Sequence, residues 1–257
     1  MNRILIAGYG KMGSWLCTLL GKKYKCAVYE IDNDVRNQNP NVFFIDSASQ
    51  ISDFEPEIFI NCVNLSNTIT VFRDLSQYLT AGCILSDITS VKNDLQSYYS
   101  NCGHRFVSIH PMFGPTFTDM SRPVGRTAYL IGESDSLAKK FFNQIFIDEG
   151  IKTVECTFNE HDRLMSKLLS LPVLQAILFA GTGAIEPVKG TTYEKYHDLT
   201  RMVLGENQGL LNSILANPYT VSVISEMIET LSNAKDSILS GKPIKTEQLF
   251  NQVESKR

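Results

Sequence analysis

The sequence predicts an α/β protein in which a doubly wound parallel sheet comes first and an all-helical C-terminal domain follows. Over roughly the first 110 residues, short apolar runs rich in β-branched residues alternate with segments of helical length. From residue 159 onward, apolar residues recur at helical spacing instead. The 257 residues, 43% hydrophobic and 20% charged, are enough to bury the cores that two such domains need.

Strands and helices are expected to alternate through the first part of the chain. The expected strands are residues 3–7, 25–30, 42–45, 58–63, 83–87, 106–109, 127–131 and 152–155. The expected helices between them are residues 11–20, 67–79, 91–99 and 136–149, the last opened by a Ser/Asp cap. Alternation of this kind is typical of parallel strands joined by helices that cover both faces of a sheet.

The second part of the chain is expected to be helical. Pro172 lies inside the first helical pattern, where it is expected to kink the helix. Further helices are expected at residues 195–216, 218–240 and 245–254. Because the pattern changes near residue 156, we expect one domain over residues 1–156 and a second over 157–257. Helices this apolar cannot hide every face against one sheet domain, so the helical part is expected to form a homodimer.

Composition argues against several classes of function. The chain carries 24 Lys and Arg against 27 Asp and Glu, a net charge of −3, which favours neither nucleic acid nor an anionic membrane surface as a partner. Its six cysteines form no CxxC pair, so buried thiols are favoured over a metal or redox site. We also expect a cytoplasmic protein, because no leader and no apolar stretch of about 18 residues is apparent.

A glycine-rich loop joins the first expected strand to the first expected helix. Residues 8–13 read GYGKMG, which has the GxGxxG spacing of a dinucleotide-binding turn. The first glycine permits the tight turn, the second lets the backbone approach a pyrophosphate, and the third lets helix and strand pack closely. Free N–H groups at the helix N-terminus would then hold the phosphates. The sequence therefore predicts a Rossmann domain that binds a dinucleotide.

An acidic residue at the end of the second expected strand indicates which dinucleotide binds. Glu30 can accept hydrogen bonds from both ribose hydroxyls and would repel a 2′-phosphate, so NAD is favoured over NADP. Asp32 is the competing candidate for this role. The expected cofactor-binding residues are Gly8, Tyr9, Gly10, Lys11, Met12, Gly13 and Glu30.

Two polar segments follow the fifth and sixth expected strands, at the sheet edge where open α/β sheets bind their ligands. Residues 86–92 read SDITSVK, and residues 108–115 read SIHPMFGP. With the glycine loop, they resemble the prephenate and arogenate dehydrogenases, which are marked by Asp-x-x-Ser-Val-Lys and His-Pro-Met-Phe-Gly-Pro. The resemblance continues through residues 160–162 (EHD) and 196–201 (YHDLTR), so it covers nearly the whole chain.

The resemblance implies NAD-dependent oxidative decarboxylation of prephenate to 4-hydroxyphenylpyruvate, a step of tyrosine biosynthesis, and a homodimer. It implies that His110 accepts the proton of the substrate hydroxyl, and that Ser90 bonds both this hydroxyl and the histidine. It assigns the ring carboxylate to Arg201, with Asp198 one helical turn earlier to orient the guanidinium. Lys92 supplies further positive charge for a substrate with two carboxylates.

Other residues near these motifs have alternative interpretations. His161 is expected to serve helix capping and solvation rather than chemistry. Many members of the family carry a histidine where this chain has Val173, so the substrate side chain must be recognised by other groups. Lys92, Lys167 and Gln175 are the candidates, and a lysine there would favour prephenate over the ammonium of arogenate.

Rival functions stay open. Arogenate is the nearest alternative substrate, with Asp119 as a candidate partner for its ammonium group. Arg122 and Arg126 either attract an anionic substrate or are simply solvated. An imine reductase or a β-hydroxyacid dehydrogenase would not need Ser90 and His110 together. A catalytically idle NAD-binding protein is a further alternative, and it would bind the cofactor without turnover.

Overall fold

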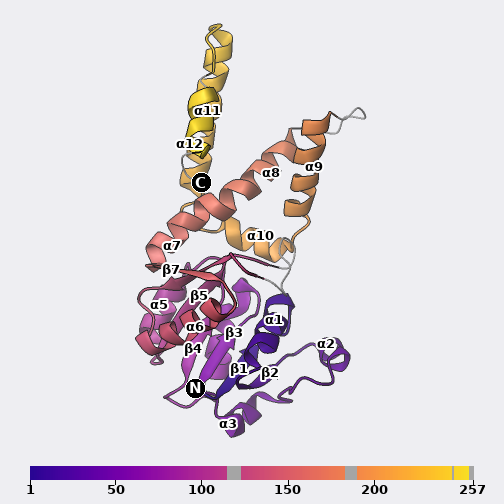
Figure 1. Ribbon diagram of the computed structural model, residues 1–257, viewed down its shortest axis with the longest axis vertical. Helices are drawn as coiled ribbons and strands as arrows, with labels where there is room; N and C mark the ends of the chain where they lie inside the picture. Colours follow the sequence, from indigo (N-terminus) through magenta and orange to yellow (C-terminus); the bar gives the residue numbers. More distant parts are fainter. Residues whose placement is uncertain (115–122, 183–189, 245, 255–257) are drawn as a thin grey trace.

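A seven-stranded sheet forms one half of the molecule, and a set of helices forms the other (Figure 1). The computed structural model describes residues 1–114, 123–182, 190–244 and 246–254. The strands are β1 (Arg3–Ala7), β2 (Lys25–Tyr29), β3 (Ile58–Asn61), β4 (Ile84–Asp87), β5 (Phe106–Pro111), β6 (Thr127–Ile131) and β7 (Lys152–Cys156). Their order in the sheet is β2-β1-β3-β4-β5-β6-β7, and only β5 and β6 pair antiparallel. This is the doubly wound α/β class that the sequence predicts.

The helices fall into two groups along the chain. The first group is α1 (Lys11–Leu20), α2 (Asn33–Gln38), α3 (Ile51–Phe54), α4 (Thr68–Ser76), α5 (Leu95–Asn101) and α6 (Ser136–Asp148). The second group is α7 (Phe158–Met165), α8 (Leu171–Gly181), α9 (Thr191–Leu204), α10 (Gln208–Leu215), α11 (Thr220–Leu239) and α12 (Thr246–Glu254). We call residues 1–156 the sheet half and the remainder the helical half.

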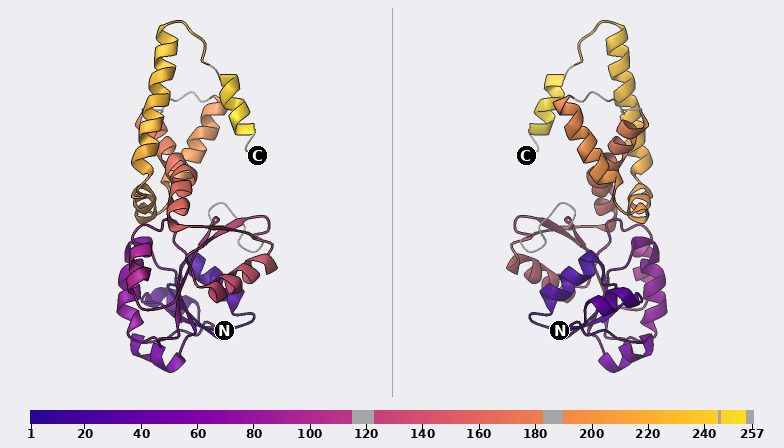
Figure 2. Two further views of the ribbon diagram at one scale, coloured as in Figure 1. Left: turned by 90° about the vertical axis from the view of Figure 1, so that its left-hand side faces the viewer. Right: turned by 90° about the vertical axis from the view of Figure 1, so that its right-hand side faces the viewer.

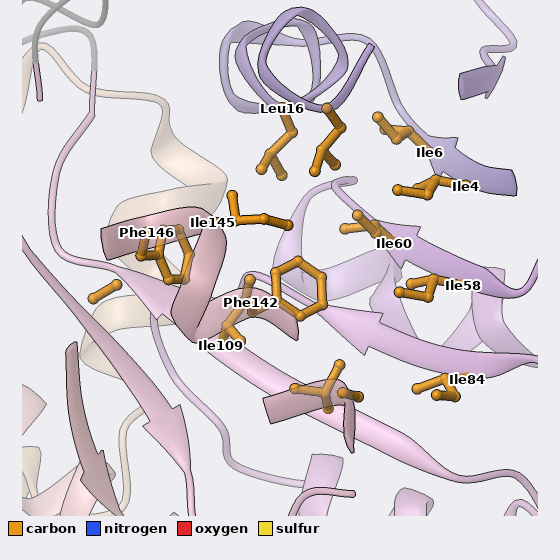
Figure 3. Close-up of a cluster of buried hydrophobic side chains, with 14 of the residues drawn as sticks. Ile4, Ile6, Leu16, Ile58, Ile60, Ile84, Ile109, Phe142, Ile145 and Phe146 are labelled. Carbon is orange, nitrogen blue, oxygen red and sulfur yellow. The ribbon is translucent and has the colours of Figure 1, made fainter. Parts of the chain in front are cut away.

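Each face of the sheet is packed against its own helices. Along β1, alternate residues such as Ile4 and Leu5 point to opposite faces and enter two different buried clusters. On one face, Leu16 of α1 and Phe142 of α6 pack onto the isoleucines of β1, β3 and β4 (Figure 3). On the other face, the cluster includes Phe72 of α4 together with residues of α3 and α5. The sheet half therefore closes its own core.

Two expected elements differ from the structure, and local hydrogen bonds explain one of them. Residues 42–45 do not form a named strand, although Phe44 makes a single parallel bridge to Val28 beyond β2. The helix expected over 195–216 is two helices, because the Asn207 side chain accepts hydrogen bonds from the N–H groups of Gly209 and Leu210 and so begins α10 anew.

The helical half is open by comparison. Its buried apolar cluster consists of Val173, Leu211 and Ile214 among the described residues. α11 extends away from the sheet half, and its C-terminal part rises beyond α8 and α9 (Figure 2). Apolar side chains on α11 such as Ile228 and Leu231 remain more than half exposed. These helices leave apolar faces that nothing in the described chain covers.

One helix is long and apolar enough to cross a membrane. It runs from Phe158 to Gly181 with a mean hydropathy of 1.6, whereas the sequence was expected to hold no apolar stretch of that length. The chain stays helical through Pro172, because a π-helical turn over Ser166–Ser170 precedes it. His161 and Asp162 near the start of this helix are buried, and the Asp162 carboxylate is hydrogen-bonded to the sheet half. That end of the helix is therefore part of the protein interior.

Candidate functional site

The glycine loop has the geometry that a bound pyrophosphate requires. Gly8 has a φ of +90°, which disfavours any side chain. A Cβ on Gly13 would lie 2.1 Å from the Gly8 carbonyl oxygen, so only glycine lets α1 pack this closely. A Cβ on Gly10 would meet no atom within 4 Å, so the space above the loop is open. Because no side chain caps α1, its first N–H groups are free to bind phosphate oxygens.

The two acidic candidates for ribose binding have different surroundings. The Glu30 carboxylate accepts a hydrogen bond from the Tyr9 N–H at 2.7 Å, so it lies directly beside the glycine loop. The Asp32 carboxylate instead caps α2 and accepts bonds from the N–H groups of Asp34 and Val35. Glu30 is half-buried and each of its oxygens accepts one backbone N–H, which leaves lone pairs for ribose hydroxyls.

His110 lies at the carboxyl end of β5, the edge of the sheet to which the glycine loop also belongs. Its side chain is buried, with the residue 4% exposed. The Met112 N–H donates to the carbonyl oxygen of Thr127 and so anchors the chain just beyond it. The ring of Phe113 packs edge-on against Trp15 of α1, with 5.3 Å between ring centroids. This contact ties the histidine motif to the helix that follows the glycine loop.

Lys92 has a different environment from the one expected. Its side chain is completely buried, and its Nζ donates to Asp87 Oδ2 at 2.6 Å and to the Ile109 carbonyl oxygen at 2.7 Å. The ammonium group therefore links the ends of β4 and β5. It does not face a space that a substrate could enter, which differs from the role expected for it.

Asp87 is the centre of this buried network. Thr89 donates to its Oδ2 through the backbone N–H and the hydroxyl, and the Tyr99 hydroxyl donates to Oδ1 at 2.8 Å. Burial alone would raise the pKa of Asp87, but the neighbouring Lys92 ammonium more than offsets it and lowers the pKa. Burial, with Asp87 adding to it, raises the pKa of Tyr99 well above its usual value, so Tyr99 stays a neutral donor.

His161 and Asp162 complete the site, and His161 has a different role from the one expected. His161 is fully buried, its Nε2 lies 3.0 Å from His110 Nδ1, and its Nδ1 lies 2.9 Å from Asp162 Oδ1. The expectation that His161 serves capping and solvation is wrong, because Thr157 and Glu160 form the capping box of α7. His161 instead faces inward and joins the helical half to the proposed base.

Both imidazoles are held neutral by their surroundings. Burial lowers the pKa of His110 well below its usual 6.5, and the nearby His161 and Lys92 lower it further. Burial also lowers the pKa of His161, although its hydrogen bond to Asp162 acts in the opposite direction. At neutral pH the His110 ring is therefore in the form that can accept a proton.

The other expected substrate-binding residues are only partly brought together. Ser90 lies in the segment that joins Asp87 to Lys92, and its side chain is half-buried. Its hydroxyl makes no hydrogen bond to His110 within the described residues. Arg201 is exposed in the last turn of α9, at the end of that helix nearer the sheet half (Figure 1). Asp198 lies 3.5 Å from the His197 ring and does not pair with Arg201 in the described chain. Arg201 thus keeps its guanidinium available for a carboxylate.

The remaining candidates near the substrate have other partners or lie elsewhere. Val173 is buried in the small apolar cluster of the helical half. Lys167 forms an ion pair with Glu226 of α11, and Gln175 is exposed on α8. Arg126 is exposed. Asp119 and Arg122 lie outside the described residues.

Neither thiols nor acidic clusters indicate a metal site. All six cysteines are free, and burial raises the pKa of Cys26 and of Cys83 to about 12. In the part of the chain that the structure describes, no group of three or more His, Cys, Asp or Glu side chains is placed to hold a metal ion.

Comparison with known proteins indicates the same family as the motifs. Residues 21–123 match the family model described as the nucleotide-binding domain of prephenate dehydrogenase. A probable arogenate/prephenate dehydrogenase from Methanocaldococcus jannaschii is 28% identical over 115 residues, which cover 42% of this chain and 25% of that protein.

Two solved structures share the whole fold. The prephenate dehydrogenase of A. aeolicus, in complex with hydroxyphenyl propionate and NAD+, has a TM-score of 0.85 at 19% identity and covers 100% of this chain and 97% of its own. The arogenate dehydrogenase of Synechocystis has a TM-score of 0.76 at 17% identity, covering 99% of this chain and 98% of its own. This chain spans 25% and 34% of the length of the two curated relatives it matches. The resemblance that the motifs indicated is confirmed.

Proposed function

Starting from its resemblance to the prephenate and arogenate dehydrogenase family, we propose that this chain catalyses the NAD-dependent oxidative decarboxylation of prephenate to 4-hydroxyphenylpyruvate. The bound NAD would accept a hydride from C4 of the substrate ring. His110 takes the proton of the C4 hydroxyl as the carbonyl forms. The bond from the ring to its carboxylate breaks, CO2 leaves, and the released electron pair completes the aromatic ring as the C4 carbonyl becomes a phenolate. The His110 imidazolium then returns the proton to this oxygen, which gives the phenol of 4-hydroxyphenylpyruvate. The oxidation of one carbon thus balances the reduction of the cofactor.

The observation that carries this proposal is the pairing of a dinucleotide loop with a buried, neutral histidine at one edge of the sheet. Gly10 opens the loop to phosphates, Glu30 lies beside it, and His110 lies near the carboxyl end of β5 at the same edge of the sheet. One ring nitrogen of His110 is hydrogen-bonded to His161, which leaves the other for a substrate proton. A general base needs this combination of position and neutral form.

The positive charge of the site would come from Arg201. Its planar guanidinium can bind a carboxylate through two parallel hydrogen bonds, and no ion pair within the described residues competes for it. Ser90, in the turn after β4, supplies a hydroxyl at the same sheet edge as His110. We assign Ser90 to the substrate hydroxyl, and we assign Lys92 to holding the strand ends rather than to the substrate.

Prephenate is proposed over arogenate because Glu160 and Asp162, the two acids at the start of α7, are already engaged. The Glu160 carboxylate accepts a hydrogen bond from the Thr157 N–H in the capping box. The Asp162 carboxylate is hydrogen-bonded to His161 and to two backbone N–H groups. Neither is left to pair with the ammonium of arogenate. Arogenate stays the second candidate, since the Synechocystis neighbour of the same fold is an arogenate dehydrogenase.

The deciding experiment is NADH formation, followed by absorbance, with purified prephenate and arogenate in parallel. We expect turnover with both NAD and prephenate present, and a lower kcat/KM with arogenate. A clear preference for arogenate would overturn the substrate assignment. NAD binding without turnover of either compound would mean that the chain is a cofactor-binding protein without this activity. The variant His110→Asn is the matched control, because it removes the proposed base and leaves the glycine loop untouched.

We further propose that a second copy of this chain covers the exposed helices. The apolar side chains left exposed on α11 are Val221, Ile224, Ile228, Leu231, Ile238 and Leu239. An apolar surface of this extent is unfavourable in water unless a partner buries it. Because a second copy presents the same helices, a twofold pairing would bury both sets at once. Sedimentation at micromolar concentration tests this, and a monomer would contradict it.

A further inference from the structure

We propose that His161 and Asp162 are positioning residues which hold His110 in the one tautomer that a general base can use, with its proton on Nδ1 and its lone pair on Nε2. That His110 acts as a base rests on the proposed function. The tautomer itself follows from the hydrogen-bond geometry alone. Neither residue is expected to touch the substrate.

The direction of the hydrogen bonds is fixed at Asp162. Asp162 Oδ1 accepts from the Lys92 N–H at 2.8 Å, and Oδ2 accepts from the Asn93 N–H at 2.8 Å. A backbone N–H can only donate, so both carboxylate oxygens are acceptors. Since Oδ1 also lies 2.9 Å from His161 Nδ1, this ring nitrogen must carry a proton. Neutral His161 is then left with its lone pair on Nε2.

The same constraint passes to His110. Its Nδ1 lies 3.0 Å from His161 Nε2, and a hydrogen bond between them needs one proton. Because Nε2 of His161 is the acceptor, His110 Nδ1 is the donor. A neutral His110 therefore has an unprotonated Nε2, the nitrogen that would take the substrate proton. When it does so, the new imidazolium keeps its Nδ1–H bond, and the Asp162 carboxylate stabilises the charge through His161.

The two backbone donors are themselves rigidly held. Asn93 has a φ of +24°, which asparagine tolerates better than most residues but which needs support from its surroundings. The preceding Lys92 supplies this support, because its ammonium is bonded to Asp87 and to the Ile109 carbonyl oxygen. On the helical side, the Asn217 amide donates to the Asp162 carbonyl oxygen at 2.8 Å. The tautomer of the base is thus set by groups from both halves of the chain.

Nuclear magnetic resonance of the imidazole nitrogens tests the tautomer directly. The chain has four histidines, so protein labelled with 15N-histidine gives few signals, and the loss of one set in His110→Asn identifies His110. We expect two-bond correlations that show a protonated Nδ1 and an unprotonated Nε2 on His110. A proton on Nε2, or rapid averaging between the two forms, would overturn the proposal. Because this readout needs no turnover, it separates failure of the proposal from failure of the proposed function.

Two amide substitutions of His161 test its effect on catalysis. The longer side chain of His161→Gln can still offer an oxygen to His110 Nδ1, whereas that of His161→Asn reaches only Asp162. We expect kcat to fall by about 10–100-fold in His161→Asn, part of what a general base contributes. Substrate KM and NAD affinity should change little, and His161→Gln should recover most of the loss. Equal activity of the two variants would contradict the positioning role.

A matched control separates these effects from general loss of structure. His104 Nδ1 lies 3.2 Å from the Cys83 carbonyl oxygen, before β4 and β5 and so at the opposite end of the strands. His104→Gln should leave both kcat and the His110 tautomer unchanged. If His161→Asn does not fold, the His110 tautomer of the unsubstituted protein still decides the proposal.

Discussion

The sheet half and the helical half of this chain bury their apolar side chains in different ways. In the sheet half, helices cover both faces, and residues such as Phe59, Phe72 and Phe142 are completely buried. In the helical half, the described chain buries a cluster of three apolar residues, while Leu239 stays 78% exposed. One half therefore closes its own core, and the other lacks a complete one.

This difference explains where the proposed chemistry is located. His110 lies near the end of β5 and Glu30 directly follows β2, so strands of the closed core can hold both positions within a narrow range. The helical half contributes His161 and Asp162 only through the first turns of α7, where that helix is anchored on the sheet half. Farther from the sheet half, α11 of a single copy contributes neither to the closed core nor to the proposed site.

Removing a large side chain from the closed core should cost far more than removing one from the open helices. Phe142→Ala deletes a ring that is 0% exposed, and we expect a loss of about 3–5 kcal/mol in the free energy of unfolding. Leu239→Ala, at a largely exposed position, should stay within about 0.5 kcal/mol. Urea unfolding measures both. Comparable losses would mean that the helical half is as well packed as the sheet half.

Removing the proposed base should strongly reduce turnover without disturbing the cofactor loop. His110→Asn keeps a polar side chain but not the proton acceptor, so kcat should fall by about 100-fold or more. NAD affinity, measured by fluorescence titration, should hardly change because the glycine loop is intact. Retained activity would remove His110 from the mechanism.

A charge placed on α11 should weaken assembly, whereas a charge placed on the exposed surface of the sheet half should not. Leu231→Glu places a carboxylate on the open face of α11, and it should weaken the proposed dimer by about 1.5–3 kcal/mol, the value of burying a leucine. Leu137→Glu is the matched control, because Leu137 is 61% exposed on α6 of the closed half. Sedimentation over a range of concentrations compares them. A dimer equally stable in both variants would place the interface elsewhere.

Arg201 tests whether the helical half contributes to substrate binding. Arg201→Ala removes a charge-assisted contact of about 1.5–3 kcal/mol from the bound substrate and from the transition state. The KM for prephenate should therefore rise by about 10-fold or more, with a smaller change in kcat. An unchanged KM would show that the ring carboxylate is bound by another group.

Local patterns in the sequence predicted much of the fold and part of the site. The strand Arg3–Ala7 and the helix Lys11–Leu20 were predicted to the residue, because the glycine loop between them marks both boundaries. The position of His110 followed from the rule that parallel strands end at a common edge. These signals all lie within a few residues of the feature they predict.

Long-range contacts were not predictable in the same way. His161 is 51 residues from His110, and its Glu-His-Asp context is equally typical of a helix start. Lys92 was expected to meet the substrate because a sequence shows that a side chain is charged but not that it is buried. One hydrogen-bond partner of its ammonium group, Asp87, lies five residues away in the sequence. The other, the Ile109 carbonyl oxygen, is brought close only by the fold. Burial and partner choice therefore had to come from the structure.

The smallest expected effect is a dependence of stability on pH that arises where the two halves meet. The pKa values of His110 and His161 lie below 6.5 in the folded chain, so between those values and 6.5 the unfolded chain binds more protons. The contribution of these two histidines to the free energy of unfolding should therefore be complete above pH 6.5 and should decrease as the pH drops below it. The slope is at most about 1.4 kcal/mol per pH unit for each histidine.

Other titratable groups around these rings limit the pH range in which the effect of the histidines can be measured. Lys92, Asp87, Asp162, Tyr129 and Cys156 are the charged and titratable groups near the two imidazoles. Because the pKa of Asp87 is lowered from 3.8 in the folded chain, its own contribution is lost only as the pH falls below that value. Urea unfolding between pH 5 and 7 should therefore report mainly on the histidines. His110→Asn should flatten the slope in this window, and an unchanged slope would mean that the buried imidazole at the end of β5 does not resist protonation.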